Sequence, residues 1–151
     1  MTPEDPGDDV RIGGTSPVAW PVVARIWRTV DVERTVADLG LSSEPVDPDE
    51  LFGGQGVLVR PPDGPPIVVL EPSTEGRLAA TLARHGEGDA GVYVAPPGGL
   101  SEARKAGLTL GRTGRGPFGP EALQLMTDEN ALGTAQRFVV IVEPPPATIE
   151  P

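Results

Sequence analysis

The chain has 151 residues, which suits one domain with a single core. Its 22 acidic and 12 basic residues give a formal net charge of −10, which repels nucleic-acid phosphates, so DNA and RNA are not expected partners. It has no cysteine and one histidine, which excludes disulfides, a thiol nucleophile and a multi-histidine metal site. Because we recognise no signal peptide and no apolar run of about 18 residues, we expect a cytoplasmic protein without a membrane partner.

Both ends of the chain are rich in proline and polar residues. Residues 1–18 form an acidic segment without hydrophobic periodicity. Residues 145–151 continue a run of prolines, which lack the N–H donors that a strand needs. We expect both segments to be flexible, which leaves one domain over residues 19–144.

The first element expected within the domain is a strand over residues 22–30, which are rich in valine, isoleucine, tryptophan and threonine. Asp31 is placed to cap a helix by accepting a backbone N–H, and the apolar residues that follow recur at helical spacing. Gly40 is placed to end that helix in a left-handed conformation. Residues 43–54 are expected to be a loop.

Two short strands, residues 56–60 and 66–70, are joined by a segment with an Asp63-Gly64 step, which is typical of a tight hairpin. A helix then follows within residues 73–87. Ser73 is its expected N-cap, and Gly86 is expected to end it.

The second half of the chain repeats the order of strand, helix and strands. We expect these elements at residues 91–95, 100–107, 108–112, 121–126 and 138–143. Residues 114–119 fit a GxGxxG pattern, but the flanking prolines and the strand-like run that follows them indicate a turn and not a dinucleotide site.

An internal repeat supports a duplicated unit. Corresponding segments in the two halves occur in the same order at similar spacing: 25–27 with 91–93, 39–41 with 106–108, and 68–72 with 140–144. The predicted fold is therefore α+β, with two βαβββ modules, 22–72 and 90–144, joined by the linking helix 73–87. We expect the modules to form a cup-shaped, partly open mixed sheet with the helices outside.

The stretch VVLEPSTEGRLAATLARHGEG followed by GVYVA resembles the vicinal oxygen chelate (glyoxalase and bleomycin resistance-like) family. Within that family the pattern is nearest to that of methylmalonyl-CoA epimerases. The resemblance covers roughly residues 22–144, and it implies a cup that encloses a small ligand.

Metal-dependent members of this family take ligands from the first and last strands of each module, commonly histidine and glutamate. The resemblance places these positions at Arg25, Val68, Gly91 and Val140. A guanidinium has no acceptor, and glycine and valine offer no donor atom to a metal. We therefore expect neither a metal nor another cofactor.

Strand alternation from Arg25 places Trp27 and Thr29 on the same face, which would meet Gly91 and Tyr93 of the second module as a pocket wall. Alternatively, the two aromatic residues are ordinary core residues. The full set of expected ligand-binding residues is Arg25, Trp27, Thr29, Val68, Gly91, Tyr93, Gln124, Met126 and Val140.

The leading hypothesis is a metal-independent small-molecule binding protein that sequesters or carries a natural product, as drug-resistance members of the family do. A rival hypothesis is an enzyme. It would be either a metal-free isomerase or cyclase, with possible lyase chemistry, or a diverged acyl-thioester epimerase. In such an enzyme Arg25 would bind a substrate oxygen. A third hypothesis, a non-catalytic scaffold, predicts a pocket filled by the protein's own side chains. The sequence leaves open whether the modules pair within one chain or across a homodimer.

Overall fold

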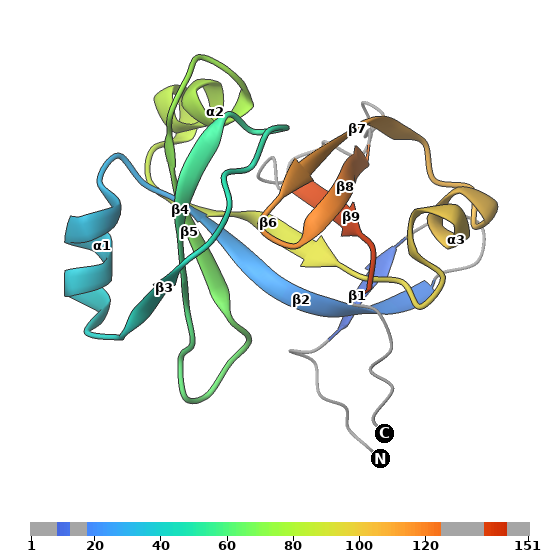
Figure 1. Ribbon diagram of the computed structural model, residues 1–151, viewed down its shortest axis with the longest axis horizontal. Coiled ribbons are helices and arrows are strands. Elements are labelled where there is room, and N and C mark those ends of the chain that lie inside the picture. The colour runs from blue at the N-terminus through green and yellow to red at the C-terminus, as the bar shows by residue number, and fades with distance from the viewer. Residues whose placement is uncertain (1–8, 13–17, 125–137, 145–151) are drawn as a thin grey trace.

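The computed structural model describes residues 9–12, 18–124 and 138–144 (Figure 1). The elements up to the end of the first module are β1 (Asp9–Ile12), β2 (Val18–Arg28), α1 (Val32–Leu39), β3 (Ser43–Pro45), β4 (Gly54–Val59) and β5 (Ile67–Pro72). The remaining elements are α2 (Arg77–His85), β6 (Gly88–Val94), α3 (Gly99–Lys105), β7 (Leu110–Gly116), β8 (Gly119–Gln124) and β9 (Phe138–Val142).

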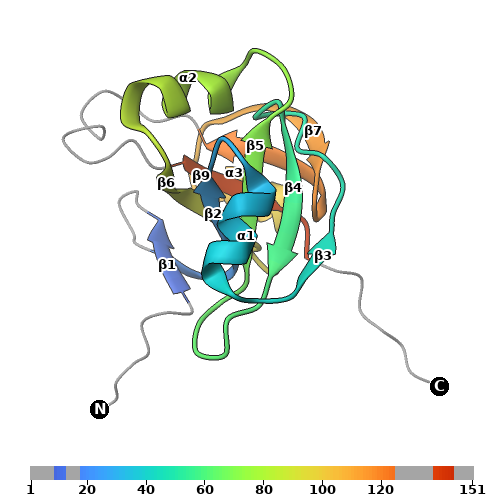
Figure 2. The same ribbon diagram turned by 90° about the vertical axis from the view of Figure 1, so that its left-hand side faces the viewer.

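These strands form one curled mixed sheet in the order β3-β4-β5-β2-β6-β9-β8-β7, and β1 pairs with β2 in addition. Each half of the sheet contains one parallel pair, β2 with β5 and β6 with β9, while the other pairs are antiparallel. Figure 1 shows the two halves side by side, and Figure 2 shows α1 and α2 outside the curl. The predicted α+β class and cup-shaped sheet are confirmed.

The two halves join through β2 and β6, which pair antiparallel with Ala24 opposite Tyr93 and Ile26 opposite Gly91. The repeated apolar segments of the sequence are equivalent strands, because β5 lies beside the first strand of its half and β9 lies beside β6. The repeat therefore reflects a repeated structural unit.

Local sequence signals predict α1 correctly. The side chain of Asp31 accepts a hydrogen bond from the Arg34 N–H at 3.1 Å, and Gly40 has a φ of 70°. The prediction for α2 is wrong at its start, because the helix begins at Arg77 and Ser73 does not cap it. Instead the Ser73 N–H donates to the carbonyl of Gly53 at 2.8 Å, which ties this segment to the preceding loop.

Three details differ from the expected elements. Residues 43–45 form the short strand β3 where a loop was expected, and β1 lies in a segment where no strand was expected. The connection between β4 and β5 runs from Arg60 to Pro66, so Asp63 and Gly64 lie in a longer loop and not in a two-residue hairpin. The prediction of a turn within residues 114–119 is confirmed by the β7–β8 hairpin.

The loop between β3 and β4, residues 46–53, crosses from the first module to the second. The Glu50 N–H donates to the carbonyl of Arg115 at 2.9 Å, and the Arg115 N–H donates to Glu50 Oε1 at 3.0 Å. Because Arg115 lies on β7, at the far end of the sheet order, this crossing loop joins the two ends of the curl.

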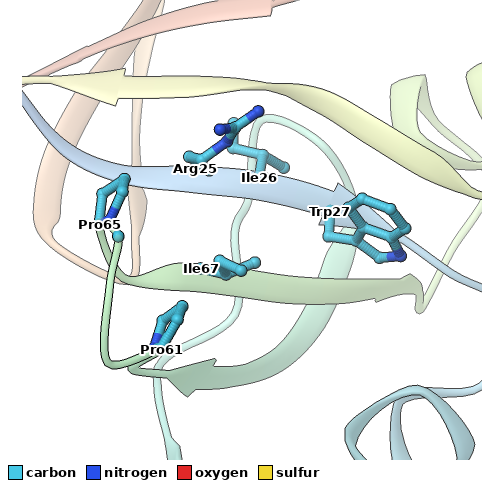
Figure 3. A pocket seen from close by; sticks show the side chains of 7 residues that line it. Arg25, Ile26, Trp27, Pro61, Pro65 and Ile67 are labelled. Carbon is cyan, nitrogen blue, oxygen red and sulfur yellow. The ribbon is translucent and has the colours of Figure 1, made fainter. Parts of the chain in front are cut away.

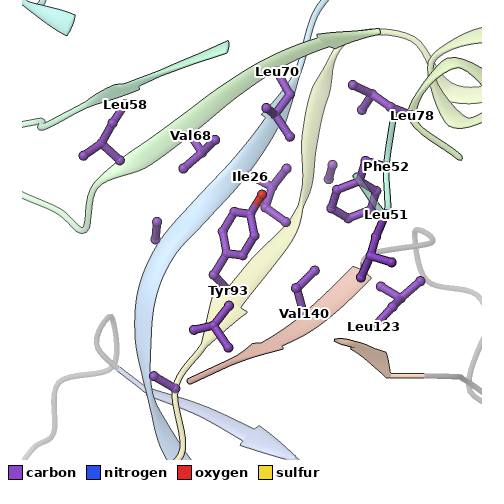
Figure 4. Close-up of a cluster of buried hydrophobic side chains, with 14 residues drawn as sticks. Ile26, Leu51, Phe52, Leu58, Val68, Leu70, Leu78, Tyr93, Leu123 and Val140 are labelled. Atoms are coloured by element: carbon purple, nitrogen blue, oxygen red, sulfur yellow. The ribbon is translucent and has the colours of Figure 1, made fainter. Parts of the chain in front are cut away.

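Two groups of buried apolar side chains occupy the two sides of the sheet. The group inside the curl includes Ile26, Phe52, Leu70, Tyr93 and Val140 (Figure 4). The other group packs beneath α3, which contributes Leu100 and Ala103. No helix in the described part of the chain is long and apolar enough to cross a membrane.

Candidate functional site

The structure separates the residues predicted to form one pocket wall. Ala24 and Ile26 are buried inside the curl, whereas Arg25 and Trp27 are exposed on its outer side. The expectation that Arg25 and Trp27 face Tyr93 across a common wall is therefore corrected. The apolar neighbours Ala24 and Ile26 occupy the inward positions of β2 because their burial is favourable, and this turns Arg25 outward.

The other predicted positions on β5, β6 and β9 do lie together inside the curl. Val68, Tyr93 and Val140 are each fully buried and belong to the same apolar group (Figure 4). Tyr93 lies directly opposite Val140 in the β6–β9 pair, and Phe52 from the crossing loop belongs to this group. The protein's own side chains thus fill the centre of the cup.

Thr29 and Gly91 were also predicted to bind a ligand, but each has a structural role. The Thr29 hydroxyl lies 2.7 Å from the Thr35 hydroxyl and donates to Glu87 at 3.0 Å, at the junction of β2 and α1. A Cβ atom at Gly91 would lie 2.0 Å from the Phe138 carbonyl oxygen, so glycine permits the close approach of β6 and β9. Gln124 is half-buried at the end of β8, and Met126 lies outside the described residues.

Arg25 and Trp27 border an outer cavity of about 330 Å³ (Figure 3). Pro61 and Pro65 of the β4–β5 connection and Ile67 of β5 form its apolar side. Arg25 also pairs with Asp89 at 3.3 Å, and both side chains are partly exposed, so this ion pair contributes little to stability. The outer cavity is lined by residues of the first module alone.

A polar cluster lies inside the curl at the crossing loop. Asp49 is buried, and its Oδ2 accepts a hydrogen bond of 2.7 Å from the Tyr93 hydroxyl. Its Oδ1 accepts a hydrogen bond of 3.1 Å from the Phe52 N–H. Two donors directed at the two oxygens match the acceptor-only character of a carboxylate. Burial and the neighbouring Asp49 raise the pKa of Tyr93 well above its usual value, so its phenol keeps the proton that it donates.

Glu121 on β8 completes this cluster. Its side chain is fully buried, and its carboxyl group hydrogen-bonds with the carboxyl group of Asp49. Burial, together with the nearby carboxyl groups of Asp49 and Glu50, raises the pKa of Glu121 to about 10. At neutral pH Glu121 is therefore protonated, as expected when two carboxyl groups share a buried site.

Gly116 on β7 makes room for this carboxyl group. A Cβ atom at Gly116 would lie 2.2 Å from Glu121 Oε1, which is shorter than any tolerable contact. The glycine pattern of residues 114–119 thus provides space for Glu121 as well as a hairpin turn.

An inner cavity of about 300 Å³ lies beside this cluster. Both modules contribute to its lining, which consists of Val23, Leu58, Arg60, Pro66, Phe118, Val142 and Glu143. Val142 is the direct cross-strand partner of Glu121, and the ring of Phe118 packs edge-on against Tyr93 with centroids 5.1 Å apart. The lining of the inner cavity is therefore in contact with the residues of the buried cluster.

The interior does not fit the metal site that the fold family implies. The inward residues of β2, β5, β6 and β9 are apolar, apart from the protonated phenol of Tyr93. Among the described residues no three histidine, cysteine or acidic side chains gather in a way that could hold a metal ion. We therefore derive no chemical step through a metal.

Sequence reasoning missed Asp49 and Glu121. Asp49 falls in a segment expected to be a loop, where an acidic residue is not unusual. The position of Glu121 could have been noticed, because Glu121 and Leu123 lie two residues apart on β8 and therefore point to the same face. Leu123 belongs to the interior group. A charged residue at an inward strand position is unusual unless its charge is compensated.

Comparison with models of known protein families gives no match, and comparison with curated proteins also gives none. Solved structures do match. A methylmalonyl-CoA epimerase from Mycobacterium tuberculosis has a TM-score of 0.63 at 19% identity, over 89% of this chain and 94% of that one. A hypothetical protein from Bacillus halodurans has a TM-score of 0.62 at 14% identity, over 85% and 97%.

A Streptomyces coelicolor methylmalonyl-CoA epimerase in complex with 2-nitronate-propionyl-CoA has a TM-score of 0.60 at 16% identity, over 81% of this chain and 96% of that one. These likenesses extend over most of the chain at low sequence identity. The chain therefore has the vicinal oxygen chelate fold, as the sequence resemblance implied.

Proposed function

We propose that this protein uses the vicinal oxygen chelate fold to bind a small organic molecule in the inner cavity, without a metal. The observation that carries this proposal is an apolar cavity lined by both modules and backed by buried carboxyl groups. Binding sites are typically apolar concavities with a few polar groups, and ionisable residues with shifted pKa values mark such sites.

The lining supports a ligand with a substantial apolar part. Leu58, Phe118 and Val142 offer apolar surface, while Arg60 and Glu143 stand at the polar end. Arg60 already pairs with Glu44 at 3.0 Å on the surface, so it is an incidental polar neighbour and not a dedicated anion anchor. A natural product that the protein sequesters or carries is one class of ligand that matches this lining.

The outer cavity is a second location for the same function. Trp27 offers a flat apolar face with 38% of its surface exposed, and Arg25 offers a guanidinium at the same rim. This combination would suit an aromatic carboxylate. We rank it second because only the first module forms it.

A metal-free isomerase or diverged acyl-thioester epimerase is the alternative function. Two observations favour it: the solved epimerases have the same fold, and the protonated Glu121 is a buried acid beside the carboxyl group of Asp49. Arg25 is a poor candidate for its catalytic residue, since it lies outside the curl and is paired with Asp89. Incorporation of deuterium from D₂O into methylmalonyl-CoA would support this alternative, and its absence at high protein concentration would exclude that substrate.

Thermal unfolding in the presence of aromatic natural products and acyl-CoA thioesters tests the proposed binding. A ligand that binds the folded state raises Tm as its concentration increases. The variants Phe118→Ala and Trp27→Ala then distinguish the two cavities, since each removes an aromatic ring from one of them. Weakening by Phe118→Ala alone supports the inner cavity, and weakening by Trp27→Ala alone supports the outer one. No shift with any compound would contradict the proposal.

A further inference from the structure

Strand β7 lies at one end of the sheet, and among the described strands it pairs only with β8 (Figure 1). Its other edge is bonded to the crossing loop at one residue, Arg115. The Arg115 N–H donates to Glu50 Oε1 at 3.0 Å, and the Arg115 carbonyl accepts from the Glu50 N–H at 2.9 Å. Within the described part of the chain, no other backbone hydrogen bond covers this edge. We call its uncovered part, residues 110–114, the free edge of β7.

Thr113 directs its backbone groups out of the free edge. The register of β7 against β8 is continuous from residue 113 to residue 116, with Thr113 opposite Ala122 and Arg115 opposite Pro120. In an antiparallel pair, residues two apart direct their N–H and C=O groups to the same side. Because Arg115 directs both groups to the crossing loop and away from β8, Thr113 also directs its groups away from β8. Thr113 is exposed, so it offers a donor and an acceptor to an extended segment of another chain.

Exposed basic residues lie along the free edge. Arg112 and Arg115 stand on either side of Thr113, and Arg104 and Lys105 end the helix α3 that precedes this strand. These are four of the 12 basic residues in a protein whose net charge is −10. None of the four forms an ion pair with another described residue, since the ion pairs of this part of the chain all belong to other arginines. The free edge therefore carries a local positive charge that no ion pair neutralises.

This charge distinguishes between the possible partners of a free strand edge. A second copy that paired through the same edge would bring its arginines beside these, and like charges across a strand pair are destabilising. A nucleic acid has no peptide backbone to pair with the edge, and the net charge of −10 repels it. An extended segment with carboxylate side chains matches both the backbone groups of Thr113 and the guanidinium groups beside it.

We propose that the free edge of β7 binds an extended acidic segment of a partner protein. The segment adds as a short strand beside β7, exchanges hydrogen bonds with the backbone of Thr113, and places carboxylates near Arg112 and Arg115. The added strand is short because the crossing loop occupies the edge at Arg115. None of these three residues lines the inner or the outer cavity, so the inference goes beyond the proposed function and is independent of it.

Three hexapeptides with blocked ends separate strand pairing from charge. The peptide TVEEVT carries two adjacent glutamates, which point to opposite faces of a strand. The peptide TVQQVT has the same shape without the charge, and TPEEPT keeps the charge but has prolines that cannot donate to a strand. Each peptide is titrated at the same ionic strength into the full-length ¹⁵N-labelled protein. The amide signal of Thr113 reports binding, and its hydrogen exchange reports whether the N–H becomes bonded.

We expect TVEEVT to shift the Thr113 amide signal saturably and to bind about threefold or more tightly than TVQQVT, because each exposed ion pair adds only modestly to affinity. Hydrogen exchange at Thr113 should slow by about tenfold when nine-tenths of the protein is bound, since only the unbound fraction then exchanges. The peptide TPEEPT should leave this exchange unchanged.

A double variant tests the two arginines of the edge. Arg112→Gln with Arg115→Gln should bring the affinities for TVEEVT and TVQQVT to within about twofold. Arg77→Gln with Arg84→Gln removes the same charge from exposed positions on α2 and should leave the preference in place. Circular dichroism confirms that both double variants are folded.

Equal affinities for TVEEVT and TVQQVT in the wild-type protein would overturn the inference, as would equal binding of TPEEPT. These comparisons need no variant, so they hold even if a double variant fails to fold. A Thr113 signal that moves with protein concentration in the absence of peptide would assign the edge to a second copy and would also overturn it. If no peptide moves the Thr113 signal at millimolar concentration, the inference fails, while the proposed function is unaffected.

Discussion

The hydroxyl of Tyr93 on β6 donates a 2.7 Å hydrogen bond to Oδ2 of Asp49 in the crossing loop. This bond joins β6 to the crossing loop, which connects the two ends of the curled sheet. Both side chains are buried, so neither group can replace the bond with water.

Removal of the Tyr93 hydroxyl should destabilise the fold. We expect Tyr93→Phe to lower the free energy of unfolding by about 1–3 kcal/mol, because it leaves the buried Asp49 carboxylate short of one donor. Chemical denaturation measures this loss. A double-mutant cycle with Asp49→Asn should show that the two effects are not additive. Additive effects would mean that the bond contributes nothing of its own.

The protonated state of Glu121 predicts an unusual dependence of stability on pH. Its pKa is raised from 4.5 to about 10 in the folded state, so the folded state holds a proton that the unfolded state releases above its own pKa. Stability is fully present below the unfolded pKa and falls as pH rises toward the folded pKa, by up to about 1.4 kcal/mol per pH unit.

We therefore expect wild-type stability to decline from about pH 5 to about pH 9 relative to Glu121→Gln, whose amide does not titrate. Urea denaturation at a series of pH values measures the difference between the two proteins. The exposed substitution Glu75→Gln is the matched control and should follow the wild-type curve. A constant difference between wild type and Glu121→Gln across this range would show that Glu121 is not protonated in the folded protein.

Gly116 should be intolerant of any side chain. We expect Gly116→Ala to cost about 1–3 kcal/mol of folding stability, since its Cβ would lie 2.2 Å from Glu121 Oε1 and would force the buried carboxyl group of Glu121 to move. Gly64→Ala provides the control, because nothing lies within 4 Å of the Cβ it would add. Thermal unfolding of both variants tests this. Combining Gly116→Ala with Glu121→Ala should recover part of the loss, and equal Tm values for the two alanine variants would refute the steric explanation.

Glu87 should contribute stability that disappears in acid. Its carboxylate accepts hydrogen bonds from the Val30 N–H at 2.9 Å and from the Thr29 hydroxyl at 3.0 Å, and it pairs with Arg34. The Val30 N–H is the largest cause that lowers the pKa of Glu87 below 4.5.

Because the folded pKa of Glu87 is the lower one, its contribution is present above pH 4.5 and is lost as the pH falls through the folded pKa. Glu87→Gln should thus lower Tm at neutral pH and converge with the wild type in acid. Thermal unfolding at several pH values measures this, with Glu75→Gln again as the control. A Tm difference that grows in acid would contradict the assignment.

The sequence by itself determined the duplication and the order of the elements other than the short strands β1 and β3. The N-cap at Asp31, the left-handed Gly40 and the turn at Pro117 and Phe118 are local features, each set by a few adjacent residues. The strands β5 and β9 could likewise be predicted from the sequence, because a strand that is buried on both faces consists of a continuous apolar run.

Only the tertiary structure decided which side of β2 faces the interior. The pairing of β2 with β6 shifts register between Val22 and Ala24 and again between Ile26 and Trp27. Alternation still places Arg25 and Trp27 on one face, but alternation alone does not say which of the two faces points inward. Packing against the rest of the sheet decided this, and it placed Ala24 and Ile26 inside the curl and Arg25 outside.

The meeting of Asp49, Tyr93 and Glu121 was also decided in three dimensions. These residues come from the crossing loop, β6 and β8, and no local pattern links them. Their approach depends on the curl of the sheet, on the bridge from Glu50 to Arg115, and on the space beside Gly116. A buried carboxyl pair is therefore a property of the packed fold, because only exclusion of water makes two acidic residues share a proton.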